Sequence, residues 1–241
     1  MASNNPHAKE NAALNEIMRE LKERANPRNV AGMAAFGINP AGTLGVNIPT
    51  LRTIARCHAG NHRLALQLWK TGVHEARLLA AFVDDPRLVT PRQMDSWAAG
   101  FDSWDVCDQA CCSLFDQTPW AFEKAVEWSG RKEEFVKRAG FALAAGLAWH
   151  DKKTGDKEFE KLLPIIAREA RDGRNFVKKA VNWALRNVGK RNAQLNNAAI
   201  ATAKRIARQP FASARWIAAD ALRELQSNAV KERIAAKERR S

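Results

Sequence analysis

Four side chains in the middle of the sequence have the chemistry of a site for a charged, ring-containing ligand. They are Trp104, Asp108, Arg138 and Trp183. A carboxylate can stabilise a developing positive charge or activate water, and tryptophan rings attract cations through their π faces. An arginine binds phosphate through charge-assisted hydrogen bonds. The combination indicates chemistry on nucleic acid. The alternative is structural: Trp183 closes the edge of the core and Asp108 pairs with a nearby Arg or Lys.

The aspartate and the first tryptophan fall on one predicted helix. Ser103 is a suitable N-cap, and the core stripe that follows consists of Cys107, Ala110, Cys111 and Leu114. Trp104 and Asp108 are four residues apart, so both lie on one flank of this helix beside the core stripe.

A second predicted helix covers Val177 to Val188. Its apolar stripe has the i, i+3, i+4, i+7 spacing of a helix and consists of Val177, Ala180, Val181, Ala184, Leu185 and Val188. A neighbouring stripe mixes aromatic and basic side chains, and consists of Phe176, Lys179, Trp183, Arg186 and Lys190. Such a face suits nucleic acid, since cations meet phosphates and rings lie against sugars or bases. We therefore expect Lys178, Lys179, Arg186 and Lys190 to bind DNA together with Arg138.

Helix boundaries recur along the whole chain. Thr90-Pro91 and Thr118-Pro119 each place a capping hydroxyl before a proline at the first helical position. Stop signals in the second half are Gly130, Gly155, Gly173 and Pro210. Alternating β-type patterns are absent, so we expect an all-α protein of about a dozen helices.

The helices also resemble one another. Arg138–Ala144, Lys179–Leu185 and Arg215–Ala221 align at intervals of about 40 residues, with a weaker copy at Arg77–Ala80. This interval predicts a HEAT-like helical-repeat solenoid, curved with a basic concave face, although an ordinary helical bundle with accidental similarity would also fit. We expect one repeat domain over residues 1–241, with capping helices at 1–25 and 228–241. The second of these, around Lys231–Arg240, reads as a solvated helix with a fraying end.

The charge of the chain narrows the class of partner. Its 241 residues carry a formal net charge of +13, and the excess is dispersed along the sequence. A polyanionic partner explains this charge, whereas a membrane-surface role would require one basic amphipathic helix. The remaining alternative is a protein that is basic without binding a polyanion. No apolar run is long enough to span a membrane, and the first residues lack the pattern of a signal peptide.

The cysteines and histidines do not suggest a metal site. Cys57, Cys107, Cys111 and Cys112 form no CxxC pair, so we expect buried, reduced thiols, and the spacing of Cys57 to His58 and His62 supplies too few ligands for zinc. His74-Glu75 lacks the second histidine of a zinc motif, and we expect it at an exposed helix start. We expect no metal and no cofactor.

Four segments in sequence order resemble the DNA alkylation repair family, the AlkD-type DNA glycosylases built from HEAT-like repeats. Leu44–Arg52 is similar to its LG-hydrophobic-x-x-P-x-x-R segment, and Ser103–Asp108 to its SWWDxVD-like segment. Arg138 takes the place of a phosphate-facing arginine, and Lys179–Arg186 resembles a KAxxWxLR helix. One departure is Ser103, at a position where a second tryptophan occurs in the family.

The resemblance implies hydrolysis of the N-glycosidic bond of cationic N3- or N7-alkylated purines in duplex DNA, without base flipping. It implies that Asp108 stabilises the sugar cation and positions water, while Trp104 and Trp183 face the sugar and Arg138 holds a phosphate. We expect a monofunctional glycosylase that leaves an abasic site. We also expect a monomer in the cytoplasm, associated with the nucleoid when bound to DNA.

Two other functions remain open from the sequence. A non-catalytic DNA- or RNA-binding solenoid would use the same basic face and tolerate loss of Asp108. A protein-interaction scaffold, a common use of HEAT-like arrays, would favour an apolar or acidic groove over the basic residues of the predicted face.

Overall fold

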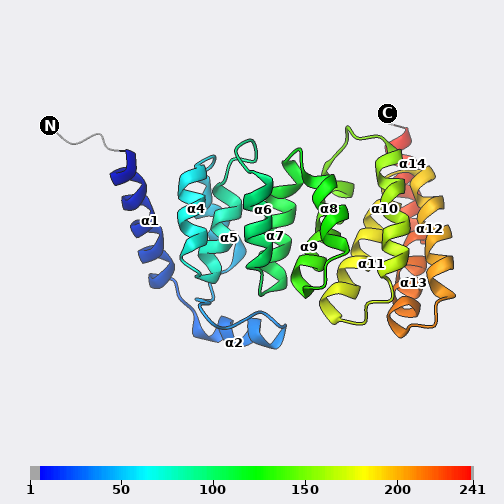
Figure 1. The fold of residues 1–241 in the computed structure, drawn as a ribbon, viewed down its shortest axis with the longest axis horizontal. Coiled ribbons are helices and arrows are strands. Elements are labelled where there is room, and N and C mark those ends of the chain that lie inside the picture. Colours follow the sequence, from blue (N-terminus) through cyan, green and yellow to red (C-terminus); the bar gives the residue numbers. More distant parts are fainter. Residues whose placement is uncertain (1–5, 240–241) are drawn as a thin grey trace. The chain divides into compact units, whose positions relative to one another are not determined.

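The computed structural model describes residues 6–239, and within that range the chain is helical, with fourteen α-helices, one 3-10 helix and no strand (Figure 1). This confirms the all-α prediction. The chain folds as two compact units that meet at Thr118–Pro119, and each is described by itself.

The first unit contains the helices from α1 to η1. They are α1 (Pro6–Glu23), α2 (Pro27–Ala35), α3 (Ile48–Arg56), α4 (His62–Lys70), α5 (His74–Val83), α6 (Pro91–Ala99), α7 (Trp104–Ser113) and η1 (Phe115–Gln117). Helix α5 packs against α3, α4 and α7, and α1 packs against α4. Between α4 and α6, the rings of Trp69 and Trp97 stack with centroids 4.2 Å apart. Helix α7 thus packs against α5, which is buried along its length except at Phe82.

The second unit contains α8 to α14. They are α8 (Ala121–Ser129), α9 (Glu134–His150), α10 (Asp156–Glu169), α11 (Asn175–Gly189), α12 (Ala193–Ala207), α13 (Ala212–Leu225) and α14 (Asn228–Glu238). Helices α8, α10 and α12 pack in sequence in one layer, and α9, α11 and α13 pack in sequence in a second (Figure 1). Every member of the predicted apolar stripe from Val177 to Val188 is buried, as expected for a helix with neighbours on both sides.

Helix α9 approaches α8 closely at Gly140. A Cβ atom there would lie 2.5 Å from the backbone nitrogen of Ser129 and 2.9 Å from the carbonyl carbon of Trp128. Because the obstacles are backbone atoms, the two helices would have to separate to admit a methyl group.

We expect Gly140→Ala to lower the free energy of unfolding by about 2 kcal/mol, a usual cost of overpacking a core. Gly130→Ala is the matched control, because its Cβ would meet no atom closer than the Glu127 carbonyl oxygen at 3.8 Å. Urea unfolding followed by circular dichroism measures both. Equal midpoints for the two variants would contradict the tight contact.

The predicted boundary signals are confirmed in part. Thr90 caps α6 by accepting a hydrogen bond from the Gln93 N–H at 3.2 Å, with Pro91 at the first helical position, and Gly130 ends α8. The prediction for Thr118-Pro119 is wrong, because the Thr118 hydroxyl donates to the Phe115 carbonyl at 2.7 Å and α8 starts only at Ala121. The prediction for Gly155 is also wrong, because it precedes α10 as its N-cap.

The remaining two stop signals lie between helices. Gly173 falls between α10 and α11, and Pro210 between α12 and α13. Both therefore mark interruptions of the helical pattern, as expected of glycine and proline in these connections.

The terminal helices lie within the predicted capping segments, of which residues 1–5 and 240–241 are outside the described residues. Helix α14 is less solvated than predicted. Val230 and Ile234 are buried, and the Lys237 ammonium donates to the Lys190 carbonyl at 2.9 Å. The helix is thus tied to the end of α11. Nowhere in the described chain is a helix both long and apolar enough to cross a membrane.

Candidate nucleic-acid site

Helix α7 presents Trp104 and Asp108 at its half-buried flank. The predicted core stripe of this helix, from Cys107 to Leu114, is fully buried, so these two side chains lie at the boundary between core and solvent. The indole Nε1 of Trp104 donates to the Phe36 carbonyl at 3.1 Å. That bond fixes the edge of the ring, and Asp108 follows one helical turn later.

Phe36 is an exposed aromatic residue whose backbone contacts this flank, and the sequence patterns did not reveal it. Its carbonyl holds Trp104, and 78% of the residue is exposed, more than any other large apolar residue among those described. It ends α2 and is followed by Gly37, whose φ of 79° turns the chain away. An aromatic residue before a turn glycine is a weak signal, which explains why it was missed.

The loop between Phe36 and α3 is held by a buried carboxylate. Glu75 accepts hydrogen bonds from the N–H groups of Leu44 at 2.9 Å, Gly45 at 2.7 Å and Val46 at 3.2 Å. Gly45 has a φ of 83°, and a Cβ there would lie 2.2 Å from the Asn26 carbonyl oxygen. Only glycine fits this position, which is part of the segment that resembled the alkylation repair family.

The expectation of an exposed His74-Glu75 is wrong, since both residues are buried. They start α5, which contacts α3, α4 and α7, so its first turn has no solvent face. The His74 imidazole Nε2 lies 2.9 Å from the Asp105 carboxylate, while the other oxygen of Asp105 accepts from the Val106 N–H at 2.9 Å. This pair fixes the first turn of α7 against α5.

Ser103 is the N-cap residue of α7, as predicted, but its hydroxyl does not form the usual capping hydrogen bond with the helix. The hydroxyl oxygen accepts from the Asn39 N–H at 2.9 Å rather than from the helix. Ser103 thereby ties the loop that follows Phe36 to the start of α7. The position of Trp104 and Asp108 thus depends on this loop and on α5.

Arg52 brings a cation to α7. Its Nη2 donates to Gln109 Oε1 at 3.0 Å, and its guanidinium lies 4.4 Å from the centre of the Phe82 ring. Gln109 follows Asp108 directly, and Arg52 is exposed. Arg52 ends the Leu44–Arg52 segment that resembles the family, but the sequence pattern alone indicated no role for it. It is the basic side chain that the described contacts place beside the aspartate-bearing helix.

Arg138 is more buried than a phosphate-facing role suggests. It lies in the first turns of α9, is 6% exposed, and donates through Nη1 to the Phe176 carbonyl at 2.7 Å. At least one of its donors therefore connects α9 to the start of α11. Its predicted contact with phosphate remains a prediction.

Helix α11 carries Lys178 and Lys179 near its start and the second tryptophan, Trp183, in its middle. Lys179 is exposed and Trp183 is half-buried. The Lys178 ammonium lies 5.3 Å from the centre of the Trp216 ring, and Trp216 on α13 is 41% exposed. A basic group of α11 and an aromatic ring of α13 thus lie in contact near the starts of these two helices. Trp216 was noted only as part of a repeat, although an aromatic next to Arg215 was a usable signal.

Two acidic residues of α13 neutralise the positive charges of Arg186 and Lys190, the last two members of the basic stripe. Arg186 lies 2.5 Å from Glu224 and 3.4 Å from Asp220, and Lys190 lies 2.7 Å from Glu224. Burial raises the pKa of Glu224, but the hydrogen bonds and charges of Lys190 and Arg186 outweigh it and leave the pKa below its usual value. The sequence pattern of one helix did not show these partners because they come from the next repeat.

We expect Glu224→Gln to release Lys190 for phosphate and to weaken the hold on Arg186, which stays paired with Asp220. Duplex affinity should rise about fivefold at moderate salt, and the slope of log affinity against log salt should steepen by about 1 to 2. Glu158→Gln is the control, because it frees Lys161 from a comparable pair at 2.6 Å on helix α10. Fluorescence anisotropy with an undamaged duplex measures both. A slope unchanged by Glu224→Gln would show that these two cations do not face DNA.

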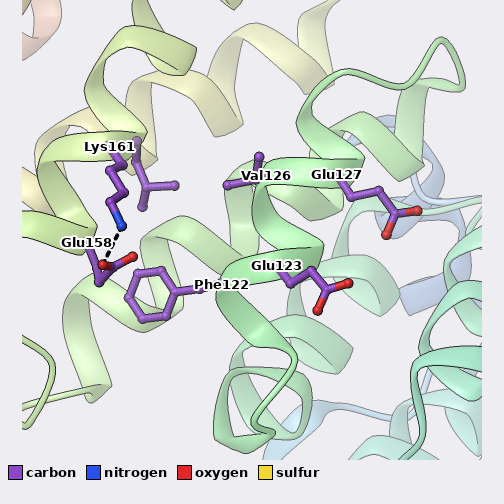
Figure 2. A pocket seen from close by; sticks show the side chains of 7 residues that line it. Phe122, Glu123, Val126, Glu127, Glu158 and Lys161 are labelled. Carbon is purple, nitrogen blue, oxygen red and sulfur yellow. Dashed lines mark hydrogen bonds and ion pairs between the residues drawn. The ribbon is translucent and has the colours of Figure 1, made fainter.

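A groove on the other layer of the second unit has the opposite character. It has a volume of about 440 Å³, and is lined by Phe122, Glu123, Val126, Glu127, Glu158, Lys161 and Leu162 from α8 and α10. Figure 2 shows the Glu158–Lys161 ion pair beside the Phe122 ring, with Glu123 and Glu127 extending from α8. The glutamates would repel phosphate, so this groove is not part of the predicted DNA face.

The cysteine thiols differ in their burial. Cys107 and Cys111 are buried as predicted, and burial raises the pKa of the Cys111 thiol. Cys57 is exposed, contrary to prediction, because it ends α3 where the chain turns. Among the described side chains, no group of three or more His, Cys, Asp or Glu is arranged to hold a metal.

Comparison with solved structures agrees with the helical-repeat fold. A protein described as "a new family of proteins related to the HEAT-like repeat DNA glycosylases with affinity for branched DNA structures" is 20% identical, and the match covers 88% of this chain and 95% of that one, with a TM-score of 0.73. A designed armadillo repeat protein in complex with a peptide is 14% identical over 78% of this chain and 80% of that one, with a TM-score of 0.35. The first match defines the fold class as HEAT-like helical repeat.

The family follows from the sequence match. Residues 17–234 match the family described as DNA alkylation repair enzyme. The chain therefore belongs to the DNA alkylation repair family, and the predicted resemblance is confirmed. No curated protein matches the chain at a significant level.

Proposed function

We propose that this protein is a DNA repair glycosylase that hydrolyses the N-glycosidic bond of cationic N3- or N7-alkylated purines in duplex DNA. The observation that carries the proposal is the Trp104–Asp108 flank of α7, half-buried beside the exposed Phe36 in a chain of the DNA alkylation repair family. A carboxylate at the edge of the core, next to aromatic rings, is the arrangement that stabilises a sugar cation.

The leaving group explains why one carboxylate is sufficient. Most glycosidases use two, one of which protonates the leaving group. An alkylated purine already carries a positive charge and leaves as a neutral base, so it needs no general acid. In this proposal Asp108 stabilises the positive charge that develops on the deoxyribose and positions the attacking water, and a preorganised anion lowers the barrier most when shielded from solvent.

The aromatic and basic residues have separate roles in the proposal. Trp104 and Trp183 present π faces to the sugar, and Phe36 lies against the backbone or a neighbouring base. Lys178, Lys179 and Arg138 bind phosphates, as does Arg52 at the aspartate-bearing helix. Arg186 and Lys190 contribute less in this proposal, because their charges are already compensated by Glu224.

The proposal includes excision without base flipping. A flipped base requires a compact pocket with stacking and hydrogen-bonding walls. The groove in Figure 2 is lined by glutamates and lies on the layer opposite α9 and α11, so it does not suit a base attached to a phosphate backbone. Bulky adducts would then be tolerated. We also propose a cytoplasmic monomer that requires no metal or cofactor and associates with the nucleoid when bound to DNA.

A second candidate is a DNA-binding protein without catalysis. The protein that shares this fold is described as having affinity for branched DNA structures, and the compensation of Arg186 and Lys190 shows that basic residues on α11 also serve the fold. Such a protein would bind DNA in a salt-dependent way and release no base.

The deciding experiment is incubation of the protein with a duplex containing N7-methylguanine, in the presence of a chelator. We expect free methylated base to accumulate over the spontaneous rate, leaving an abasic site without strand cleavage. Duplex binding without release of base would support the second candidate and contradict the first.

A further inference from the structure

A second cluster of basic and aromatic side chains lies at the carboxyl end of α9. Arg138 lies near the other end of the same helix. The rise of the helix places Trp149 about 16 Å along the axis from Arg138. Trp149 is 46% exposed, and two cations surround it: the Arg233 guanidinium at 4.7 Å and the Lys152 ammonium at 5.9 Å from the ring centre. We refer to Trp149, Lys152 and Arg233 as the Trp149 patch.

Two more cations near this patch bind backbone carbonyls at the ends of helices. Arg191 donates to the Ala148 carbonyl at 3.1 Å, and Lys237 donates to the Lys190 carbonyl at 2.9 Å. These bonds cap the carboxyl ends of α9 and α11, where cations satisfy terminal carbonyls. The capping cations therefore have a structural role. The Lys152 ammonium also donates to the Trp149 carbonyl at the end of α9, but Lys152, like Arg233, is exposed to solvent.

The positively charged side chains around Trp149 lie close enough to repel one another. The pKa of Lys152 is lowered by burial and by the charges of Arg191 and Arg233, against which Asp151 acts in the opposite direction. The pKa of Lys237 is lowered by burial and by Arg233, Lys152 and other cations. A surface on which cations disfavour one another favours an anionic ligand.

We propose that the Trp149 patch binds a single-stranded nucleic-acid segment, with an unpaired base against the Trp149 ring and phosphates on Lys152 and Arg233. An exposed indole flanked by cations is how proteins bind single strands without sequence preference. In a duplex the base faces are covered by stacking, so a ring adds binding energy only when a base is unstacked. The site goes beyond base excision, since it involves neither a lesion nor Asp108.

The test is fluorescence anisotropy with a labelled, undamaged oligo-dT, titrated at several salt concentrations. Trp149→Ala should weaken binding about tenfold, within the range for loss of one stacked base, and Trp149→Phe should restore most of it. Replacing Lys152 and Arg233 together by alanine should reduce the salt slope by about 1.4, at about 0.7 for each phosphate contact of a single strand.

Matched controls come from the same unit. Trp120→Ala removes a tryptophan that is 37% exposed and lies in none of the cation–ring contacts of the described structure, and Lys204 and Arg208 are exposed cations near the end of α12. We expect each control to leave oligo-dT affinity and salt slope close to wild type. Equal losses in patch and control variants would overturn the proposal.

Two further outcomes would overturn it. Unchanged oligo-dT binding with a lower melting temperature would make the Trp149–Arg233 contact a structural bond between α9 and α14. Equal losses for oligo-dT and for a blunt duplex would make the patch a general phosphate contact. Because the DNA is undamaged, these results do not depend on whether the protein releases methylated bases.

Discussion

Asp108→Asn should reduce release of N7-methylguanine from duplex DNA by about 100- to 1,000-fold, the range found when one preorganised electrostatic group is removed from an active site. Asparagine keeps the size of the side chain and its place on α7, one turn after Trp104, but loses the negative charge that opposes the sugar cation. Affinity for the damaged duplex should stay within about threefold, because removal of an anion does not weaken contacts to phosphates.

The measurement is single-turnover release of free base, with duplex affinity measured in parallel. Glu123→Gln is a suitable control, since it also converts a carboxylate to an amide, on an exposed position of α8 in the other compact unit. Full activity of Asp108→Asn would rule out the proposed role of Asp108. Loss of activity in both variants would point to net charge instead of a local catalytic group.

Glu75→Gln should cost the first unit about 3 kcal/mol of folding free energy. The carboxylate accepts three backbone N–H groups at 2.7 to 3.2 Å and is fully buried. Oε1 accepts from both Gly45 and Val46, and Oε2 accepts from Leu44, so an amide whose oxygen takes the place of Oε1 leaves the Leu44 N–H without its acceptor. That loss, together with the loss of the charge that strengthens the other two bonds, costs about 1 to 3 kcal/mol. The NH2 group of the glutamine would then face the Leu44 N–H, and two donors cannot form a hydrogen bond with each other.

Thermal unfolding monitored by circular dichroism tests this expectation, and a decrease in midpoint of about 6 °C or more corresponds to this loss. Glu16→Gln is the control, because Glu16 is exposed on α1, and its midpoint should match wild type. Equal midpoints for Glu75→Gln and Glu16→Gln would mean that the Leu44–Val46 loop does not depend on the carboxylate. A destabilised loop would also release Phe36 and Trp104 from their relative positions.

The helices and their buried faces were predictable because they depend on local periodicity. The stripe from Val177 to Val188 and the stripe that includes Cys107 and Cys111 are both buried as predicted. The flank position of Trp104 and Asp108 follows from the same spacing. The helix boundaries were predicted less accurately. Thr90 caps its helix, whereas Thr118 does not, because its hydroxyl donates a hydrogen bond to the Phe115 carbonyl.

The partners of the candidate site were not predictable, because they come from distant parts of the sequence. Glu224 compensates Arg186 and Lys190 from the following repeat, and the Phe36 carbonyl that holds Trp104 comes from a loop far earlier in the chain. His74-Glu75 has the composition of an exposed helix start, yet both residues are buried by the packing of α5.

The sequence by itself determined the helical class, the apolar faces, the family and the residues proposed for chemistry, because each of these depends on residue type and spacing. The tertiary structure decided which charges are available. Arg138 and Glu75 are both charged side chains, but packing uses them to hold α11 and the Leu44–Val46 loop. The physical reason is that burial and pairing depend on which helices meet, and spacing within one helix does not specify its neighbour.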